Sequence, residues 1–232
     1  RSEFFSQYVR AAWILKIRLM SSRRHLWDVQ CSLIHIESGI LQIRKACEAI
    51  SHMCLIAAAI EHGELIPSLM KNHRVGHIFK TLKKQNKLIF PEVQTVSGAC
   101  DLIEPQERTA DTLPEQDADI RKITHLHNLA GNWLHDPMIF DKWPASTDDG
   151  KAALANLLHS SRAQHKWIWD RFWSHRIAFQ DFVIVISLGN AEDLTCPALS
   201  TEGDCDIRDI TLAFDPHFLA DFSAPVDWTG YI

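Results

Sequence analysis

A seven-residue apolar repeat runs through residues 26–57, LWDVQCSLIHIESGILQIRKACEAISHMCLIA, and it decides the fold class. Its apolar positions alternate between offsets of three and four residues: Leu26, Val29, Leu33, Ile36, Ile40, Ile43, Cys47, Ile50, Cys54 and Ala57. This spacing keeps one side of an α-helix apolar and is typical of a long helix in a bundle. We therefore predict one helix over about residues 22–62, roughly 60 Å long, that ends at Gly63.

Helical spacing of apolar residues continues on both sides of this stretch. Further helices are predicted over residues 3–20, 64–87 (in one or two pieces), 114–135 and about 146–173. Ser21 and Ser22 favour a break between the first helix and the long one, because serine is a common N-cap. Residues 88–112 contain two prolines and show no helical period, so we expect a loop there with a short strand at 88–90.

The chain changes character after residue 177. Residues 182–186, FVIVI, form a continuous β-branched run, and residues 206–212, DIRDITL, alternate polar and apolar side chains. We predict a mainly α protein, an up-and-down bundle of four to six helices with a small C-terminal β-hairpin appendage. The bundle is assigned to residues 1–176, and the appendage and tail to residues 177–232.

Composition narrows the class of protein. Hydrophobic residues make up 46% of the 232 residues and charged residues 23%, as in ordinary globular domains. The longest apolar run has eight residues, too few for a membrane span. The six cysteines form no Cys-x-x-Cys pair, which favours reduced thiols in a cytoplasmic protein and disfavours a structural zinc site. Phosphate-loop, dinucleotide-binding, zinc-protease and nucleophile-elbow motifs are absent from the sequence.

Charge is divided unevenly along the chain. Residues 1–90 hold fourteen Lys/Arg and six Asp/Glu, a net of 14 − 6 = +8. Residues 91–232 hold ten and twenty-three, a net of 10 − 23 = −13. This division favours either an anionic ligand on one face or contact between halves or subunits. The alternative is that the two halves simply neutralise each other.

A strip of histidine and asparagine is the main candidate for chemistry. In residues 126–135, LHNLAGNWLH, helical spacing stacks His127, Gly131 and His135 one turn apart, with Asn128 and Asn132 beside them. Such a strip can bind a phosphate, transfer protons or ligate a metal. It can equally be a polar contact between two helices in which every ring is hydrogen-bonded. A histidine-based metal site remains the weakest of these hypotheses.

Residues 43–50, IRKACEAI, followed far downstream by residues 126–137, LHNLAGNWLHDP, resemble the HEPN superfamily (higher eukaryotes and prokaryotes nucleotide-binding domain), as a divergent member. The resemblance covers roughly residues 22–175. It implies a compact helical bundle, often a homodimer. Many members are metal-independent ribonucleases of toxin–antitoxin and other microbial defence systems, and others are catalytically inactive interaction modules.

The resemblance also implies roles for particular residues. The family's active motif is an arginine followed by a histidine after four to six residues, and Arg121 and His127 fit that spacing. Arg121 would stabilise the phosphate, His127 or His135 would act as acid or base, and Asn128 and Asn132 would orient them. We expect an endoribonuclease acting on single-stranded RNA without a cofactor or metal. The alternative is an inactive dimerisation module that docks an antitoxin or sensor protein.

A lysine stripe is the candidate RNA-binding surface. Lys80, Lys83, Lys84 and Lys87 recur at helical spacing, and Arg74 precedes them. Four ammonium groups on one face can clamp the phosphate backbone of RNA. The alternative is an ordinary solvated helix face.

Overall fold

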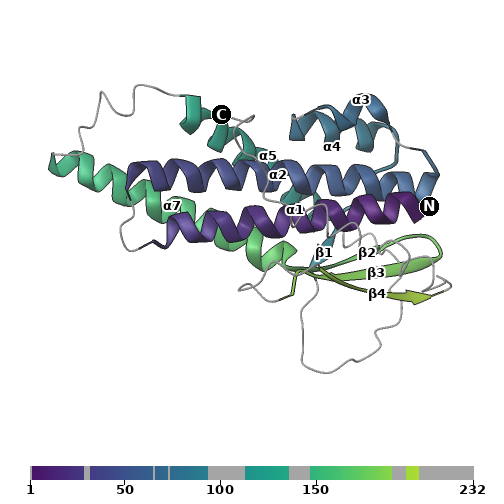
Figure 1. The fold of residues 1–232 in the computed structure, drawn as a ribbon. Helices are drawn as coiled ribbons and strands as arrows, with labels where there is room; N and C mark the ends of the chain where they lie inside the picture. Colours follow the sequence, from purple (N-terminus) through teal and green to yellow (C-terminus); the bar gives the residue numbers. More distant parts are fainter. Residues whose placement is uncertain are drawn as a thin grey trace.

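The computed structural model describes residues 2–28, 32–64, 66–72, 74–93, 113–135, 147–189 and 197–203. Its helices are α1 (Ser2–Leu26), α2 (Leu33–His62), α3 (Pro67–Met70), α4 (Val75–Lys84), α5 (Leu113–His135) and α7 (Asp148–Phe172). Its strands are β1 (Glu92–Val93), β2 (Ser174–Ala178), β3 (Phe182–Ser187) and β4 (Ala198–Gly203). The protein is therefore mainly helical with a small antiparallel sheet, as the sequence predicts (Figure 1).

The long apolar repeat belongs to two helices and not to one. Helix α1 continues through Ser22 to Leu26, and α2 begins only at Leu33, so the predicted break and the predicted helix over 22–62 are both wrong. Ser22 does not cap a helix, because its buried hydroxyl donates to the Gly39 carbonyl at 3.1 Å. A Cβ atom at Gly39 would lie 2.6 Å from Leu26. Leu26, the first member of the repeat, therefore packs against α2 at Gly39, across a helix hairpin.

Helices α1 and α2 form an antiparallel pair at the centre of the molecule (Figure 1). Arg18 Nη1 donates to Gln42 Oε1 at 3.0 Å, which fixes the register together with the Ser22 contact. At the start of α2, His35 Nδ1 accepts from the Ser32 backbone N–H at 3.2 Å. At its end Gly63 adopts φ +74° and donates to the Ala59 carbonyl at 2.8 Å, so the predicted stop is confirmed.

The core surrounds the C-terminal half of α2. All eight residues from Met53 to Ile60 are buried, because α1, α4, α5 and α7 each contact this helix. A smaller apolar cluster joins Ile36 and Ile40 to Ala130 of α5. The predicted buried side of residues 114–135 is confirmed at Ile120, Ile123 and other positions. None of the helices in the described ranges is long and apolar enough to cross a membrane.

The sheet has the strand order β1-β2-β3-β4, and its strand β2 follows directly after α7 in the chain. The predicted strand at 182–186 is confirmed as β3, which pairs with β2 on one side and β4 on the other. The predicted partner strand at 206–212 lies outside the described residues. The short strand expected at 88–90 is displaced to Glu92–Val93, where Glu92 pairs with Arg176. The sheet thus includes residues from before the predicted boundary at 176.

A buried polar pair joins α1 to the sheet. His175, at the start of β2, is fully buried, and its Nδ1 lies 2.9 Å from the Phe172 carbonyl. Its Nε2 lies 3.2 Å from the Tyr8 hydroxyl. A carbonyl only accepts, so Nδ1 carries the proton and Nε2 accepts from Tyr8. Burial lowers the pKa of His175 to about 4, partly offset by the bond to Phe172.

Candidate functional site

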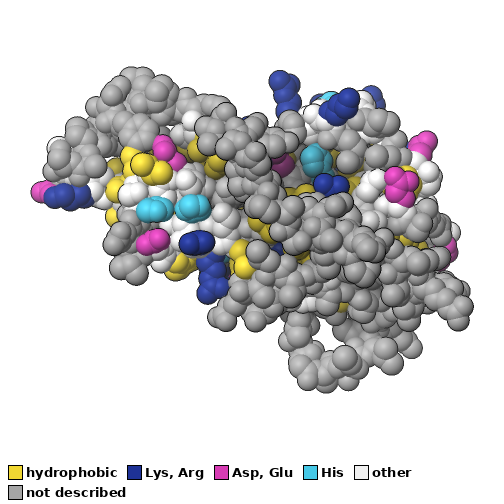
Figure 2. All heavy atoms as spheres, in the orientation of Figure 1, with side chains coloured by type: hydrophobic (Ala, Val, Ile, Leu, Met, Phe, Trp, Pro, Cys, Tyr) yellow, Lys and Arg dark blue, Asp and Glu magenta, His cyan; other side chains and the backbone are white. Residues whose placement is uncertain are grey.

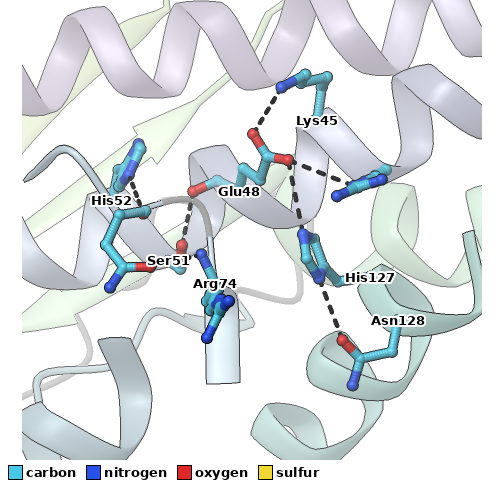
Figure 3. A network of polar contacts seen from close by, with 9 residues as sticks. Lys45, Glu48, Ser51, His52, Arg74, His127 and Asn128 are labelled. Carbon is cyan, nitrogen blue, oxygen red and sulfur yellow. Dashed lines mark hydrogen bonds and ion pairs between the residues drawn. The ribbon is translucent and has the colours of Figure 1, made fainter. Parts of the chain in front are cut away.

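The carboxylate of Glu48 is the common partner of several polar residues between α2 and α5 (Figure 3). Glu48 Oε2 lies 2.9 Å from Lys45 Nζ, and Glu48 Oε1 lies 3.6 Å from Arg44 Nε. Both cations precede Glu48 on α2 by three or four residues, which is the spacing that places side chains on one helix face. From α5, His127 Nε2 lies 3.5 Å from the same Oε1. Arg44, Lys45, Glu48 and His127 are called the Glu48 network below.

The carboxylate of the network is buried and ionised. The Glu48 side chain is only 7% exposed, and burial by itself would raise its pKa. Contacts from His127 and Lys45 outweigh that effect and lower the pKa to about 2. Glu48 is therefore negatively charged at neutral pH and holds the two cations of α2 in place. Lys45, at hydrogen-bond distance, makes the stronger of the two contacts.

His127 is enclosed between the helices and does not open onto solvent. Its side chain is 8% exposed. Its Nδ1 lies 3.4 Å from Asn128 Oδ1, and its Nε2 makes no hydrogen bond of good geometry with the described residues. The 3.5 Å contact with Glu48 is an ion pair only when the imidazole is protonated. His127 can therefore orient Glu48, but this conformation gives a substrate little access to its ring.

Arg44 reaches the predicted strip on α5. A Cβ atom at Gly131 would lie 3.4 Å from Arg44 Nη1, so the guanidinium lies at contact distance from this position of α5. An arginine of α2 therefore contacts α5 at Gly131. Arg44 stays 25% exposed, and Asn128 and Asn132 beside Gly131 are exposed. Position 135 follows Gly131 by one helical turn on the same face; the His135 side chain lies outside the described part of the structure.

The structure does not place Arg121 with His127. Arg121 is exposed while His127 is buried, and six residues correspond to a rotation of about 240° around the helix. The two side chains therefore leave α5 on different sides. The arginine that shares a carboxylate with His127 is Arg44, eighty-three positions before it in the sequence (127 − 44 = 83).

The lysine stripe is partly occupied by acidic partners. Lys83 pairs with Asp117 of α5, and Lys87, which lies beyond the end of α4, pairs with Glu64. Lys80 and Lys84 are exposed on α4. Figure 2 shows Lys and Arg side chains gathered over the upper right of the molecule, where α3 and α4 lie.

Arg74 is anchored near the Glu48 network (Figure 3). Its backbone N–H donates to Asn72 Oδ1 at 2.8 Å, and the Asn72 carbonyl lies 3.4 Å from His52 Nε2 of α2. Immediately before His52 on α2, the Ser51 hydroxyl donates to the Glu48 carbonyl at 2.8 Å. The His52 contact joins the segment before α4 to α2, and the Arg74 side chain is exposed.

The described residues offer little for a metal or a redox reaction. Within these ranges no three His, Cys, Asp or Glu side chains converge as metal ligands would. Cys47 and Cys54 are free and fully buried in α2, and burial raises the pKa of both thiols. Both cysteines therefore act as packing residues, since the thiolate is the reactive form. The other four cysteines lie outside the described residues.

Sequence spacing alone does not predict the Glu48 network as a unit. Its signal was the spacing of Arg44, Lys45 and Glu48 in IRKACEAI, but nothing local shows that α5 lies opposite this helix face. Comparisons of the chain with family models, curated proteins and solved structures give no match. Support for a function of this chain therefore comes from the geometry of the site and from the resemblance of the two motifs.

Proposed function

We propose that this chain is a HEPN-like protein of a microbial defence or toxin–antitoxin system that cleaves single-stranded RNA without a metal. The observation that supports the proposal is the position of Arg44. Its guanidinium is held by Glu48 and lies on Gly131, inside the strip that carries Asn128 and Asn132. Arg44 takes the phosphate-stabilising role that the sequence motif assigns to Arg121.

The chemistry requires a cation and a proton carrier at one phosphate. A base takes the proton of the attacking 2′-hydroxyl, the oxygen bonds to phosphorus, and an acid protonates the leaving 5′-oxygen. The Arg44 guanidinium stabilises the negative charge that develops on the phosphoryl oxygens. His135 is the proposed proton carrier, because position 135 follows Gly131 on the same helix face. His127 is a positioning residue, since it acts on Arg44 only through Glu48.

The remaining cations supply a path for the RNA backbone. Arg74, Lys80 and Lys84 are exposed on or just before α4, a helix that contacts both α2 and α5, whereas Lys83 and Lys87 are engaged with carboxylates. We assign phosphate binding to the first three residues. Their loss should weaken binding by a similar factor for all RNA sequences and reduce its salt dependence, because contacts to phosphate carry no sequence information.

The test is cleavage of an unstructured RNA in the presence of a chelator. We expect Arg44→Ala to reduce the rate by about 10²- to 10³-fold and His135→Ala by about 10²- to 10⁴-fold. Arg121→Ala is the matched control, an exposed arginine of α5 outside the network, and should cleave as the wild type does. Undiminished cleavage by Arg44→Ala, or a loss confined to Arg121→Ala, would refute the assignment.

A second candidate is an inactive dimerisation module, favoured by the enclosure of His127 and the neutralisation of Arg44 by Glu48. Its contact surface would include Ile34, which is 73% exposed, and Leu41, seven residues later on α2. Two large exposed side chains one heptad apart are typical of a helix–helix contact. If the wild type does not cleave RNA and Ile34→Glu converts a dimer to a monomer in sedimentation, this candidate replaces the first.

A further inference from the structure

A row of aromatic rings lies along α7, away from the Glu48 network. His165, Trp169 and Trp173 are spaced by four residues and so share one helix face. The centres of the Trp169 and Trp173 rings are 3.6 Å apart with an interplanar angle of 10°, a parallel stack. The centres of His165 and Trp169 are 5.5 Å apart. Trp27, the first residue after α1, extends the row with its ring centre 5.0 Å from that of His165.

Hydrogen bonds hold the inner rings of this row in fixed positions. His165 is buried, and its Nε2 lies 2.9 Å from the Leu19 carbonyl of α1. Trp173 Nε1 donates to the Gly189 carbonyl at 3.0 Å. These bonds attach α7 to α1 and to the residue pair that follows β3, so a structural role accounts for His165 and Trp173.

Packing does not account for Trp27, whose side chain is 45% exposed. A tryptophan is among the largest apolar side chains, and leaving half of one in water forgoes much of its burial energy. The ring is nevertheless held in place, because it packs edge-on against the buried His165 ring with an interplanar angle of 63°. Trp27 therefore presents a fixed, accessible aromatic surface at one end of the row.

Arginines accompany the aromatic row. The Arg162 guanidinium carbon lies 5.4 Å from the centre of the Trp27 ring, and its Nε is fixed by a 2.8 Å bond to the Leu26 carbonyl. Arg23 lies 5.6 Å from the Trp169 ring centre, and Arg24 is exposed. In Figure 2, Lys, Arg and histidine side chains lie over the left of the molecule, with acidic side chains among them, where Figure 1 places the end of α1.

We propose that Trp27 and Arg162 form a stacking site for a nucleobase of single-stranded RNA. Proteins that bind single strands combine aromatic surfaces, on which bases stack, with cations that follow the phosphates, and this surface has both. Arg24 supplies the adjacent phosphate contact. The inference deepens the proposed function and rests on it, because it names where the RNA substrate is held. This site binds bases and takes no part in the reaction.

The test measures RNA binding separately from cleavage. A short fluorescein-labelled oligouridine is titrated with full-length protein in chelator, and anisotropy gives the dissociation constant. All binding measurements use the Arg44→Ala background, which keeps the RNA intact. We expect Trp27→Ala to weaken binding by about 5- to 150-fold, from the usual worth of one stacked base. Trp27→Tyr keeps a stacking ring and should retain most of the affinity.

Two controls distinguish stacking from other effects of the substitution. Ile14→Ala removes another partly exposed apolar side chain, on α1, and should leave the affinity unchanged. Inorganic polyphosphate has no bases, so its binding should not respond to Trp27→Ala. Circular dichroism establishes that each variant keeps its helices.

The outcomes separate this inference from the proposed function. RNA binding that depends on Trp27, without cleavage by the wild type, would refute the nuclease and leave the stacking site intact. Cleavage by the wild type with unchanged binding in Trp27→Ala would overturn the stacking site alone. Equal losses for oligouridine and polyphosphate, or no binding of RNA by the Arg44→Ala parent protein, would also overturn it.

Discussion

Acidification should destabilise the protein through His175. Burial lowers its pKa to about 4 in the folded protein, whereas the ordinary value is about 6.5. The unfolded chain therefore binds a proton as the pH falls through about 6.5, while the folded protein stays neutral until about pH 4. The contribution of the neutral ring is fully present above the unfolded pKa and is lost as the pH falls toward the folded pKa.

The magnitude follows from the size of the shift. A difference of about 2.5 pKa units corresponds to about 3 kcal/mol of unfolding free energy, most of which is lost by about pH 4.5. His175 is completely buried, so solvent screening does not reduce this value. The loss of about 3 kcal/mol is a large part of the unfolding free energy of an ordinary domain.

Urea unfolding at about pH 7.5 and about pH 4.5 measures the effect. His175→Gln keeps a donor and an acceptor for Phe172 and Tyr8 but cannot titrate, so its unfolding free energy should fall less between the two pH values, by about 3 kcal/mol. Carboxylates titrate in both proteins and cancel in this difference. His159→Gln, an exposed histidine of α7, is the matched control and should behave as the wild type. Equal pH dependence of His175→Gln and wild type would refute the reasoning.

Three further substitutions test the fold. Glu48→Gln should lower the unfolding free energy by about 2 to 3 kcal/mol at neutral pH. Because the pKa of Glu48 in the folded protein is lowered to about 2, the difference from the wild type should shrink as the pH falls below about 4.5. Equal stability of the two proteins at neutral pH would contradict this prediction. Gly39→Ala should cost about 1 to 3 kcal/mol in urea unfolding, since its Cβ would lie 2.6 Å from buried Leu26, and Leu26→Ala should relieve much of that added cost in the double variant. Gly63→Ala should cost about 1 kcal/mol by the same assay because of φ +74°, and a neutral result would exclude backbone strain there.

Helix periodicity predicted which faces are buried but not where the chain reverses. The offsets of three and four continue from Leu26 into α2, so the repeat itself contains no sign of a turn. The turn becomes visible only when Leu26 is seen against Gly39, a contact between residues thirteen apart (39 − 26 = 13) that local spacing does not encode. Ser32 was the available signal, as a good N-cap residue before an apolar run.

The candidate site shows the same limit. The family's motif spacing assigns the catalytic arginine to Arg121. On a helix, however, side chains six residues apart point in different directions, so this spacing does not bring Arg121 and His127 together. Arg44 and His127 meet because α2 and α5 pack together through Ile36, Ile40 and Ala130. Strand β3 was predicted from its β-branched residues, while its partner β2 was not, since SHRIA lacks a run of that kind.

Glu48 has two effects that experiments must keep apart. It secures α5 on α2 through His127, and it holds the Arg44 guanidinium over Gly131. Loss of activity in Glu48→Gln would therefore mix lower stability with displacement of Arg44. Arg44→Lys is the more informative variant, because it keeps the positive charge beside Glu48 and removes only the planar fork that binds two phosphate oxygens. Cleavage should fall sharply in Arg44→Lys while the urea midpoint stays close to that of the wild type, and the opposite pattern would assign Arg44 to the fold alone.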